Sequence, residues 1–546
     1  MKSKYLLYSV LVGALSLTNA CTKLDENAYS LIVADEFFKN KSEVSSAVLR
    51  PYTHANAWVT PSGQDNWWRA SELSADQLAW PTKGPHGEDG GKWKRLHYHT
   101  WTVDEAGLNG AWVLMFTGLG YCNFPIEQIG MREASAMGIT EVEKASYIAE
   151  LKLFRAFHLL RAMDLWGNIP YAFKVGEPER PNTTPRKEMF DIIEKEIKEN
   201  IQAAPKLTQS MKGRMTQAGG YAMLVELYLN AEVWTGTPRW DDCIAAADAL
   251  INGQGGGQNG SMALDPNITD QFKPDNHLSK EAIFSIVYDF TTANFQPSWP
   301  SEFYHFKQRE IYGGGRNGND GIVLIPGVYT KFANNDLRKT QWLLEGPQLN
   351  FATNQPVTGS EEYRDQPLSF VDNIRKNKSG STVSNMSEGE ENSGVRFNKY
   401  KLGNQVVGFD GTPINNNYNN TDWNVYRLTW VYFAKAEALM RKAGGTATAD
   451  AVALINQSRE RAFAQADRAA AAFTTSSLTL DALLDERGKE FIFEGWRRQD
   501  LIRWNKFTTT TWWDHQPSQT YRSLFAIPQI QRGLNANLTQ NPGYPQ

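Results

Sequence analysis

Residues 141–166 constrain the fold more than any other part of this sequence. Their apolar residues, among them Leu151, Phe154 and Phe157, point to more than one side of an α-helix. A helix that is apolar on several faces has to be buried between neighbouring helices. Gly167, with a proline three positions further on, is typical of the end of a helix. The segment therefore predicts a long buried helix inside a helical array.

Further helical patterns follow in pairs, and within each pair a turn with glycine or proline joins the two helices. Small alanine residues stand where two such helices would approach closely. The arrangement resembles tetratricopeptide units, although the repeats are irregular and far apart. We therefore expect a mainly α fold, a tetratricopeptide-like helical scaffold with long loop and short-strand insertions. The expected helices cover residues 35–52, 101–129, 141–166, 185–204, 218–234, 240–251, 431–442, 449–461 and 478–504, and a coil follows to 546.

The stretches between these helices are long and polar. Residues 281–290 alternate enough to predict a strand, residues 313–321 form a glycine loop, and residues 351–420 show little periodicity. Long polar stretches between scaffold helices are usually binding loops. We expect one domain over residues 21–546, with the ligand site in these insertions.

The N-terminus has the form of a signal peptide over residues 1–20. Lys2 and Lys4 precede an apolar stretch that is too short to span a bilayer. Cys21 follows Ala20 directly, as in a bacterial lipoprotein processing site, where the thiol is acylated. An acylated cysteine would anchor the mature chain stably. The alternative is ordinary cleavage that leaves a free cysteine, and no later segment is apolar enough to predict a transmembrane helix.

Composition excludes several classes of protein. The formal net charge is −4, and no basic stripe suggests nucleic-acid binding. Three cysteines are too few for a disulfide framework or a cysteine-based zinc site, so Cys122 and Cys243 are expected to be small buried residues, with their pairing left open. The chain has 18 Trp, which favours several exposed rings; the alternative is a large core with tryptophan plugs.

The candidate catalytic and cofactor motifs lack the further residues or flanking elements that their chemistry requires. His97 and His99 are two apart but lack further metal ligands, so we expect hydrogen-bonding histidines. Residues 313–318 match a dinucleotide fingerprint but lie outside a strand-turn-helix unit, which favours a loop. We expect no enzyme, no metal and no cofactor.

Three carboxylates near the C-terminal end include two that could serve glycoside hydrolysis. Glu486, Glu490 and Glu494 lie four apart and would line one face of a helix. They alternate with basic residues such as Arg487 and Lys489. A structural network of ion pairs is therefore the favoured interpretation.

Four blocks of sequence occur in a fixed order along the mature chain. They are CTKLD at residues 21–25, AELKLFRA running on to DLWGNIP at 149–170, DERGKEF with EGWRRQDLIRW at 485–504, and FAIP with NLTQNPGY at 525–544. Together they resemble the SusD/RagB family of nutrient-binding outer-membrane lipoproteins of Bacteroidetes. One block departs: Arg427-Leu428-Thr429-Trp430 stands where that family usually has Arg-x-Ala-Glu.

The resemblance implies a helical fold with tetratricopeptide-like units and display on the cell surface, anchored in the outer membrane through Cys21. The Lys23-Leu24-Asp25-Glu26 run after this cysteine is similar to the surface-export signal of such lipoproteins. The family also implies a lid-like complex with a SusC-like TonB-dependent transporter, and a shallow aromatic site that binds oligosaccharides without cleaving them. Some relatives take peptides. The matched blocks themselves are expected to be scaffold.

Two loop regions, residues 65–93 and 295–316, have the composition of a sugar site. Sugar rings present apolar C–H faces that flat aromatic rings cover, with polar groups at the edges. Trp80 and Trp299 are expected to stack on sugar, with packing plugs as the alternative, and at most one of two adjacent tryptophans can face a ligand. The full candidate set is Asn66, Trp67, Trp68, Asp76, Trp80, Trp93, Trp299, Phe303, Tyr304 and Arg316.

Three other functions stay open at this point. A surface glycosidase would need a carboxylate pair in an aromatic cleft. A general interaction scaffold would bind on a concave helix face. A peptide-uptake protein would have a deeper cavity. A neutral polysaccharide is favoured as ligand because the candidate loops lack a dense cluster of Lys and Arg.

Overall fold

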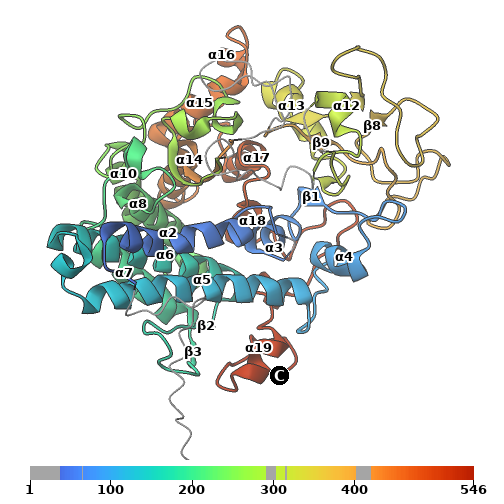
Figure 1. Ribbon diagram of the computed structural model, residues 1–546. Helices are drawn as coiled ribbons and strands as arrows, with labels where there is room; N and C mark the ends of the chain where they lie inside the picture. Colours follow the sequence, from blue (N-terminus) through green and yellow to red (C-terminus); the bar gives the residue numbers. More distant parts are fainter. Residues whose placement is uncertain (1–36, 64, 290–302, 314–316, 401–419) are drawn as a thin grey trace, which may run out of the picture.

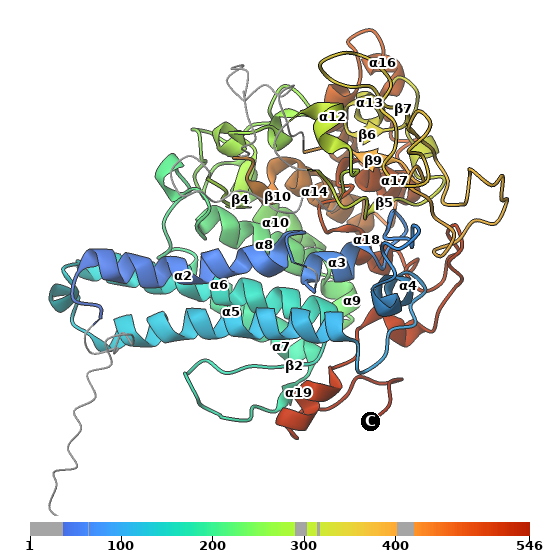
Figure 2. The ribbon, with the colours of Figure 1, turned by 45° about the vertical axis from the view of Figure 1, so that its right-hand side comes forward.

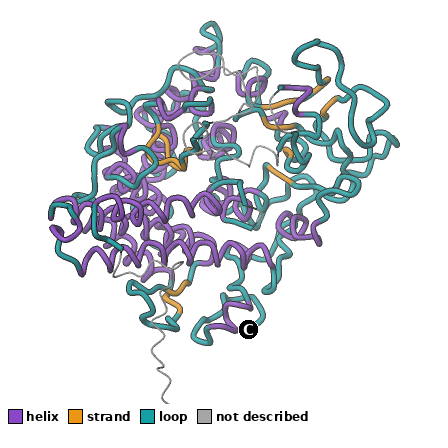
Figure 3. Tube along the Cα trace, in the orientation of Figure 1, coloured by secondary structure: helices purple, strands orange, loops and turns teal. Residues whose placement is uncertain are grey.

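Long helices packed side by side form the scaffold of the molecule, and loops with short strands cover one end of it (Figures 1 and 3). This computed structural model describes residues 37–63, 65–289, 303–313, 317–400 and 420–546. The expected mainly α fold with loop and short-strand insertions is confirmed.

The first layer of the scaffold contains four helices that pack in succession. Helix α2 (Lys41–Val59) lies on α5 (Ala106–Met131), α5 on α6 (Glu141–Trp166), and α6 on α7 (Arg186–Asn200). Figure 2 shows α2, α6 and α5 running alongside one another. The α6 helix has the predicted bounds and is buried from Ala149 to its end except at Lys152, as its many-sided apolar pattern requires.

The two ends of α6 are fixed by local chemistry. At the N-terminus, Thr140 and Glu143 form a capping box, each side chain bonded to the backbone of the other. At the C-terminus, Gly167 has a φ of +69°, and a Cβ there would lie 2.7 Å from Leu524. Glycine is therefore required both by the backbone conformation and by the approach of the C-terminal tail.

The second layer repeats the pairing. Helix α8 (Gln217–Leu229) packs on α10 (Trp240–Ile251), α10 on α14 (Leu428–Lys442), and α14 on α15 (Ala449–Arg459). The predicted helix over 218–234 is divided at Asn230 into α8 and the short α9 (Ala231–Thr235). The helix pairs expected from the sequence, α8 with α10 and α14 with α15, are confirmed.

Small two-stranded sheets hold the loops together, and those among the described residues are all antiparallel. The longest pairs β4 (Ala282–Ile286) with β10 (Trp423–Arg427), in a register that sets Ser285 opposite Asn424. The strand predicted over 281–290 is thus present, but it is buried along its whole length. The other pairs are β1 (Leu78–Ala79) with β5 (Val323–Leu324), β2 (Ile169–Pro170) with β3 (Thr183–Thr184), β6 (Leu343–Leu344) with β9 (Arg396–Phe397), and β7 (Gly346–Pro347) with β8 (Ser369–Phe370).

The final helical block differs from the expected single helix. It consists of α17 (Leu480–Glu490) and α18 (Arg497–Arg503), because Phe493 and Gly495 between them have positive φ angles of 79° and 91°. A backbone in that region cannot continue a right-handed helix. The remaining short helices are α3 (Trp67–Glu72), α4 (Lys92–His97), α12 (Gln308–Tyr312), α13 (Leu337–Gln341), α16 (Arg468–Ala471) and α19 (Gln529–Leu534).

The C-terminal tail, expected to be coil, contains α19 and is fastened to the end of α6. The backbone N–H of Phe525 donates to the carbonyl of Leu165 at 2.9 Å. The side-chain amide of Asn541 donates to the carbonyls of Trp166 and Phe525 at 2.7 and 2.8 Å. These bonds join two of the four sequence blocks and account for their role as scaffold.

Both described cysteines, Cys122 and Cys243, are buried and unpaired. The expectation that they are small core residues is confirmed. Among the described residues, no helix combines the length and the apolar sequence needed to cross a bilayer.

Candidate functional site

Two adjacent tryptophans of the first candidate loop, Trp67 and Trp68, belong to the core. They lie on α3 and are 2% and 0% exposed. The Trp67 ring packs edge-on against Trp496, with centroids 6.4 Å apart, and Nε1 of Trp68 donates to the carbonyl of Phe493 at 3.1 Å. The expectation that one of them faces a ligand is wrong, because the turn between α17 and α18 covers α3.

The other two tryptophans of this loop, Trp80 and Trp93, stack on each other. Their centroids are 4.8 Å apart with an interplanar angle of 2°, and the Arg69 guanidinium lies 4.9 Å from the Trp80 ring. Trp93 Nε1 donates to Asp89 at 2.5 Å. Trp93 is therefore a packing residue. Trp80 is 7% exposed, so a sugar could stack on it only after its neighbours moved.

The polar candidates of the first loop have structural partners. Asn66 is the N-cap of α3, and its amide also donates to the carbonyls of Thr60 and Gly63. Asp76 accepts two hydrogen bonds from Arg497, at 2.6 and 2.9 Å. Burial alone would raise the pKa of Asp76, but the charge and hydrogen bonds of Arg497 hold it below its ordinary value. Neither side chain is left free for a ligand.

The second candidate loop is described in part. Phe303 is buried edge-on against Phe493, with centroids 4.0 Å apart. The buried Tyr304 hydroxyl donates to the carbonyl of Tyr400, and burial raises the pKa of Tyr304. Both are core residues, which corrects their assignment to a binding surface. Trp299 and Arg316 lie outside the described residues, so their assignment stays a prediction.

Two partly exposed aromatic rings lie in the described part of this loop or in contact with it. The ring of Phe306 lies 4.9 Å from that of His86. Phe351 is 37% exposed and contacts the backbone at Gly313, where a Cβ would lie 2.9 Å from its ring. Neither phenylalanine lies in a periodic pattern of the sequence. Phe351 is a candidate because it lies beside Gly313 of the glycine loop, and Phe306 because it belongs to the second candidate loop.

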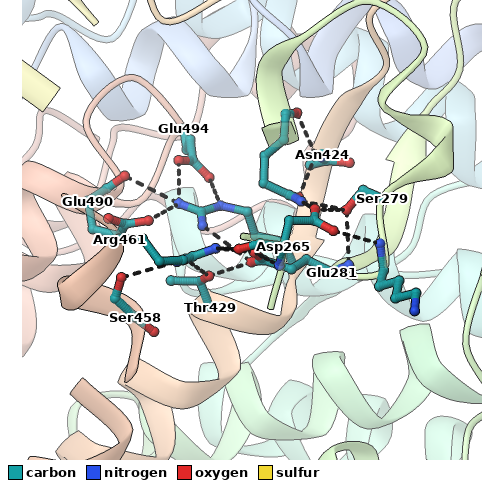
Figure 4. A network of polar contacts seen from close by, with 12 residues as sticks. Asp265, Ser279, Glu281, Asn424, Thr429, Ser458, Arg461, Glu490 and Glu494 are labelled. Carbon is teal, nitrogen blue, oxygen red and sulfur yellow. Dashed lines mark hydrogen bonds and ion pairs between the residues drawn. The ribbon is translucent and has the colours of Figure 1, made fainter. Parts of the chain in front are cut away.

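The carboxylates that could have served hydrolysis are held in buried ion pairs. Glu490 and Glu494 both accept from Arg427, and Figure 4 shows them converging on this network. Glu486 accepts from Arg338 at 2.7 Å; burial would raise the Glu486 pKa, but the positive charge of Arg338 lowers it to about 2. The expected ion-pair network is confirmed.

The partners in this network are mostly distant in sequence. Besides the neighbouring Lys489, they come from α13, the β9 region, β10 and α15: Arg338, Lys399, Arg427 and Arg459. The expectation of one continuous helical face is wrong, since Glu494 lies beyond the end of α17. Carboxylates that are enclosed in buried ion pairs are not within hydrogen-bond reach of a glycan on the surface, as a general acid would have to be.

A second part of the network joins β4 to α14 (Figure 4). Arg461 donates to Glu281 and, at 2.9 Å, to the hydroxyl of Thr429. Burial and the nearby charge of Glu281 raise the pKa of Asp265 to about 6. These contacts hold the segments that contain Asp265, Glu281 and Arg461 against helix α14.

The two histidines singled out in the sequence are buried and hydrogen-bonded. His97 Nε2 lies 2.6 Å from Asp514, and the two ring nitrogens of His99 lie 2.9 Å from the Ser518 hydroxyl and 2.8 Å from the Ser74 carbonyl. Burial lowers the pKa of His99 well below its ordinary value. Within the described ranges, no three His, Cys, Asp or Glu side chains are grouped so as to hold a metal ion.

Comparison with known proteins gives consistent matches. The model of the SusD family matches residues 248–544. The starch-binding protein SusD of Bacteroides thetaiotaomicron is 26% identical, with 79% of this chain and 78% of that protein aligned. The SusD-like protein P2 of Formosa agariphila is 24% identical, with 96% and 97% aligned.

Solved structures match over most of the chain as well. A laminarin-binding SusD-like protein aligns with a TM-score of 0.68 at 17% identity, covering 93% of this chain and all of that one. The surface glycan-binding protein A of Bacteroides thetaiotaomicron, solved in complex with laminarihexaose, aligns with a TM-score of 0.67 at 19% identity, covering 92% and 99%. At these identities the matches establish the fold.

Proposed function

Because this chain belongs to the SusD family, we propose that it is a surface lipoprotein of the outer membrane that captures a glycan and delivers it to a SusC-like TonB-dependent transporter. The observation that carries the proposal is the family match over residues 248–544, together with relatives named for binding starch and laminarin. The expected ligand is a neutral oligosaccharide or polysaccharide.

The proposed anchor is Cys21, which directly follows the signal peptide over residues 1–20. Acylation there would attach the mature chain to the membrane by several alkyl chains. Replacing Cys21 with Ser should release the protein from the membrane fraction. A variant that stays in that fraction, with its signal peptide removed, would contradict the lipid anchor.

The proposed binding surface comprises Trp299 and Arg316 together with the partly exposed rings of Phe306 and Phe351. Flat aromatic rings cover the apolar face of a sugar, and a guanidinium can bond its hydroxyls. The nearby loops contain Asn and Gly in abundance, which supply adaptable polar contacts at the rim. Capture without cleavage is consistent with carboxylates that are enclosed in ion pairs.

Calorimetric titration of the mature chain tests this function. The panel comprises starch and laminarin oligosaccharides, an anionic glycan and a mixed peptide pool. We expect saturable heat with at least one neutral glycan, and unchanged glycan when the mixture is analysed by chromatography. Binding to peptides alone would favour peptide uptake, and shortened products would identify a glycosidase; either result overturns the proposal.

The transporter partnership needs its own test. Detergent extraction of outer membranes, followed by affinity capture of this protein, should recover a TonB-dependent barrel in about equal amount. Capture without any barrel protein, from cells that grow on the bound glycan, would contradict the partnership and leave glycan binding intact.

A further inference from the structure

The outer face of α5 lacks the charges of a solvated helix. Only Glu127 among its 26 residues is charged. Val113, Phe124 and Met131 on this helix are exposed, the last of them by 65%. The helix α7, by contrast, carries lysines, glutamates and an aspartate on its exposed face. An uncharged exposed helix face of this length is expected to be covered by something.

A groove of about 690 Å³ runs between this face of α5 and α2. Its walls are apolar, with Phe38 and Phe124 at one end, where their ring centroids are 6.2 Å apart. Arg50 is the only charged residue among the described residues that line it, and its guanidinium lies 4.1 Å over the ring of Tyr121. A groove of this composition suits an apolar segment that also carries negative charge.

The first described residue, Phe37, is itself part of the groove wall. The chain that leads into it contains Leu31, Ile32 and Val33. Residues 28–36 carry two acidic residues, Asp35 and Glu36, and no basic one, a net charge of −2 that complements Arg50.

We propose that residues 28–36 of this chain lie in the groove between α2 and α5, with the apolar Leu31-Ile32-Val33 run against its aromatic wall. The length permits it: six extended residues reach about 20 Å, and the groove residues Thr117 and Phe124 are about 10 Å apart along α5.

Docking of this segment would set the distance between the body and the membrane. Sixteen residues from Cys21 to Glu36 span at most about 55 Å when extended. With residues 28–36 in the groove, only the first seven stay free, about 25 Å, and the α2–α5 face is turned toward the lipid. The consequence for membrane distance rests on the proposed anchor, whereas the docking itself does not depend on glycan capture.

Cysteine cross-linking tests the docking in the mature chain with Cys21→Ser. The native Cys122 and Cys243 are buried and do not interfere. The probe pair is Ile32→Cys with Thr117→Cys in the groove. The control pair combines Ile32→Cys with Val142→Cys, which is 80% exposed and lies beside Glu143, the ion-pair partner of Lys41 at the start of α2. A cysteine at either position, 117 or 142, is within reach of residue 32 on its tether to Phe37.

We expect the groove pair to form its disulfide at least ten times faster than the control pair. Equal rates, or a faster control, would overturn the proposal, because a freely moving tail would meet both positions alike. Slow reaction of both pairs would also overturn it, since a docked segment holds its cysteine beside the groove.

Hydrogen exchange gives a second, independent readout. A Cβ at Gly120 meets nothing within 4 Å, so a side chain there enters the groove without disturbing the helix. Gly120→Glu should repel the acidic segment, and amides of residues 28–36 should exchange at least tenfold faster than in the matched Gly120→Ala control, with α5 unchanged. Exchange of this segment at the unstructured rate in the native chain would overturn the proposal. So would protection of α5 that rises with protein concentration, because a second copy would then cover the groove.

Discussion

Arg427 and Glu494 form a bidentate ion pair in the interior, although they are 67 positions apart in the sequence. The Nε and Nη2 atoms of Arg427 each donate to one carboxylate oxygen of Glu494, both at 2.9 Å. Lys399 donates to the same carboxylate at 2.6 Å. The pair therefore joins β10, the strand that leads into α14, to the turn between α17 and α18.

Removing the charge of Glu494 should be strongly destabilising. Glu494→Gln keeps the size of the side chain but removes the negative charge that the buried Arg427 and Lys399 share, and Arg427 keeps only its remaining partner Glu490 on this side. We expect the free energy of unfolding to fall by about 3–5 kcal/mol, measured by urea denaturation. The control is Lys442→Gln at the exposed ion pair with Asp241, which should cost less than about 1 kcal/mol. Equal losses in the two variants would show that the buried network contributes no more than a surface pair.

Trp80 and Trp299 should separate in their effects. Trp80 is buried against Trp93 and Arg69, so Trp80→Ala should lower the free energy of unfolding by about 3–5 kcal/mol. Trp299→Ala should instead weaken glycan binding by about 2 kcal/mol, roughly 30-fold in Kd, with little change in stability. Thermal denaturation and calorimetric titration of both variants measure the two effects. Unchanged affinity in Trp299→Ala, with the fold intact, would remove Trp299 from the site.

The scaffold was predictable because its signals are local. The periodicity of residues 141–166 and the punctuation at Gly167 specify α6 without reference to the rest of the chain. The binding surface was not predictable in the same way. A tryptophan in a polar loop, such as Trp68, looks identical whether it faces solvent or fills a core; only the distant Phe493, which covers it, decides between the two. The pairing of Glu486 with Arg338 could not be predicted either, because the two residues are far apart in the sequence.

Glu72 should make stability depend on pH. Its carboxyl is buried on α3 and accepts from the N–H of Gly495 at 2.6 Å, and burial raises its pKa to about 8. Between about pH 4.5 and 8 the folded state keeps a proton that the unfolded state has lost. The free energy of unfolding therefore falls as pH rises through this window, by at most about 1.4 kcal/mol per pH unit.

Glu72→Gln replaces the protonated acid by a neutral amide and should remove this contribution. We expect the variant to gain stability relative to the native chain as pH rises from 5 to 8, in urea denaturation at each pH. A constant difference between the two proteins across that range would show that Glu72 does not hold its proton in the folded state.

Two glycines allow the cost of a backbone conformation to be separated from the cost of a clash. Gly495 and Gly236 both have positive φ angles, 91° and 78°. A Cβ at Gly236 meets nothing within 4 Å, whereas a Cβ at Gly495 would lie 2.6 Å from the ring of Trp67. Gly236→Ala should therefore cost about 1 kcal/mol, the price of the left-handed conformation alone. Gly495→Ala adds a collision with a ring that Trp496 holds in place, and we expect a loss of at least about 3 kcal/mol in chemical denaturation. Equal losses would mean that Trp67 can move aside, and the turn between α17 and α18 would then be less tightly packed on α3 than its contacts indicate.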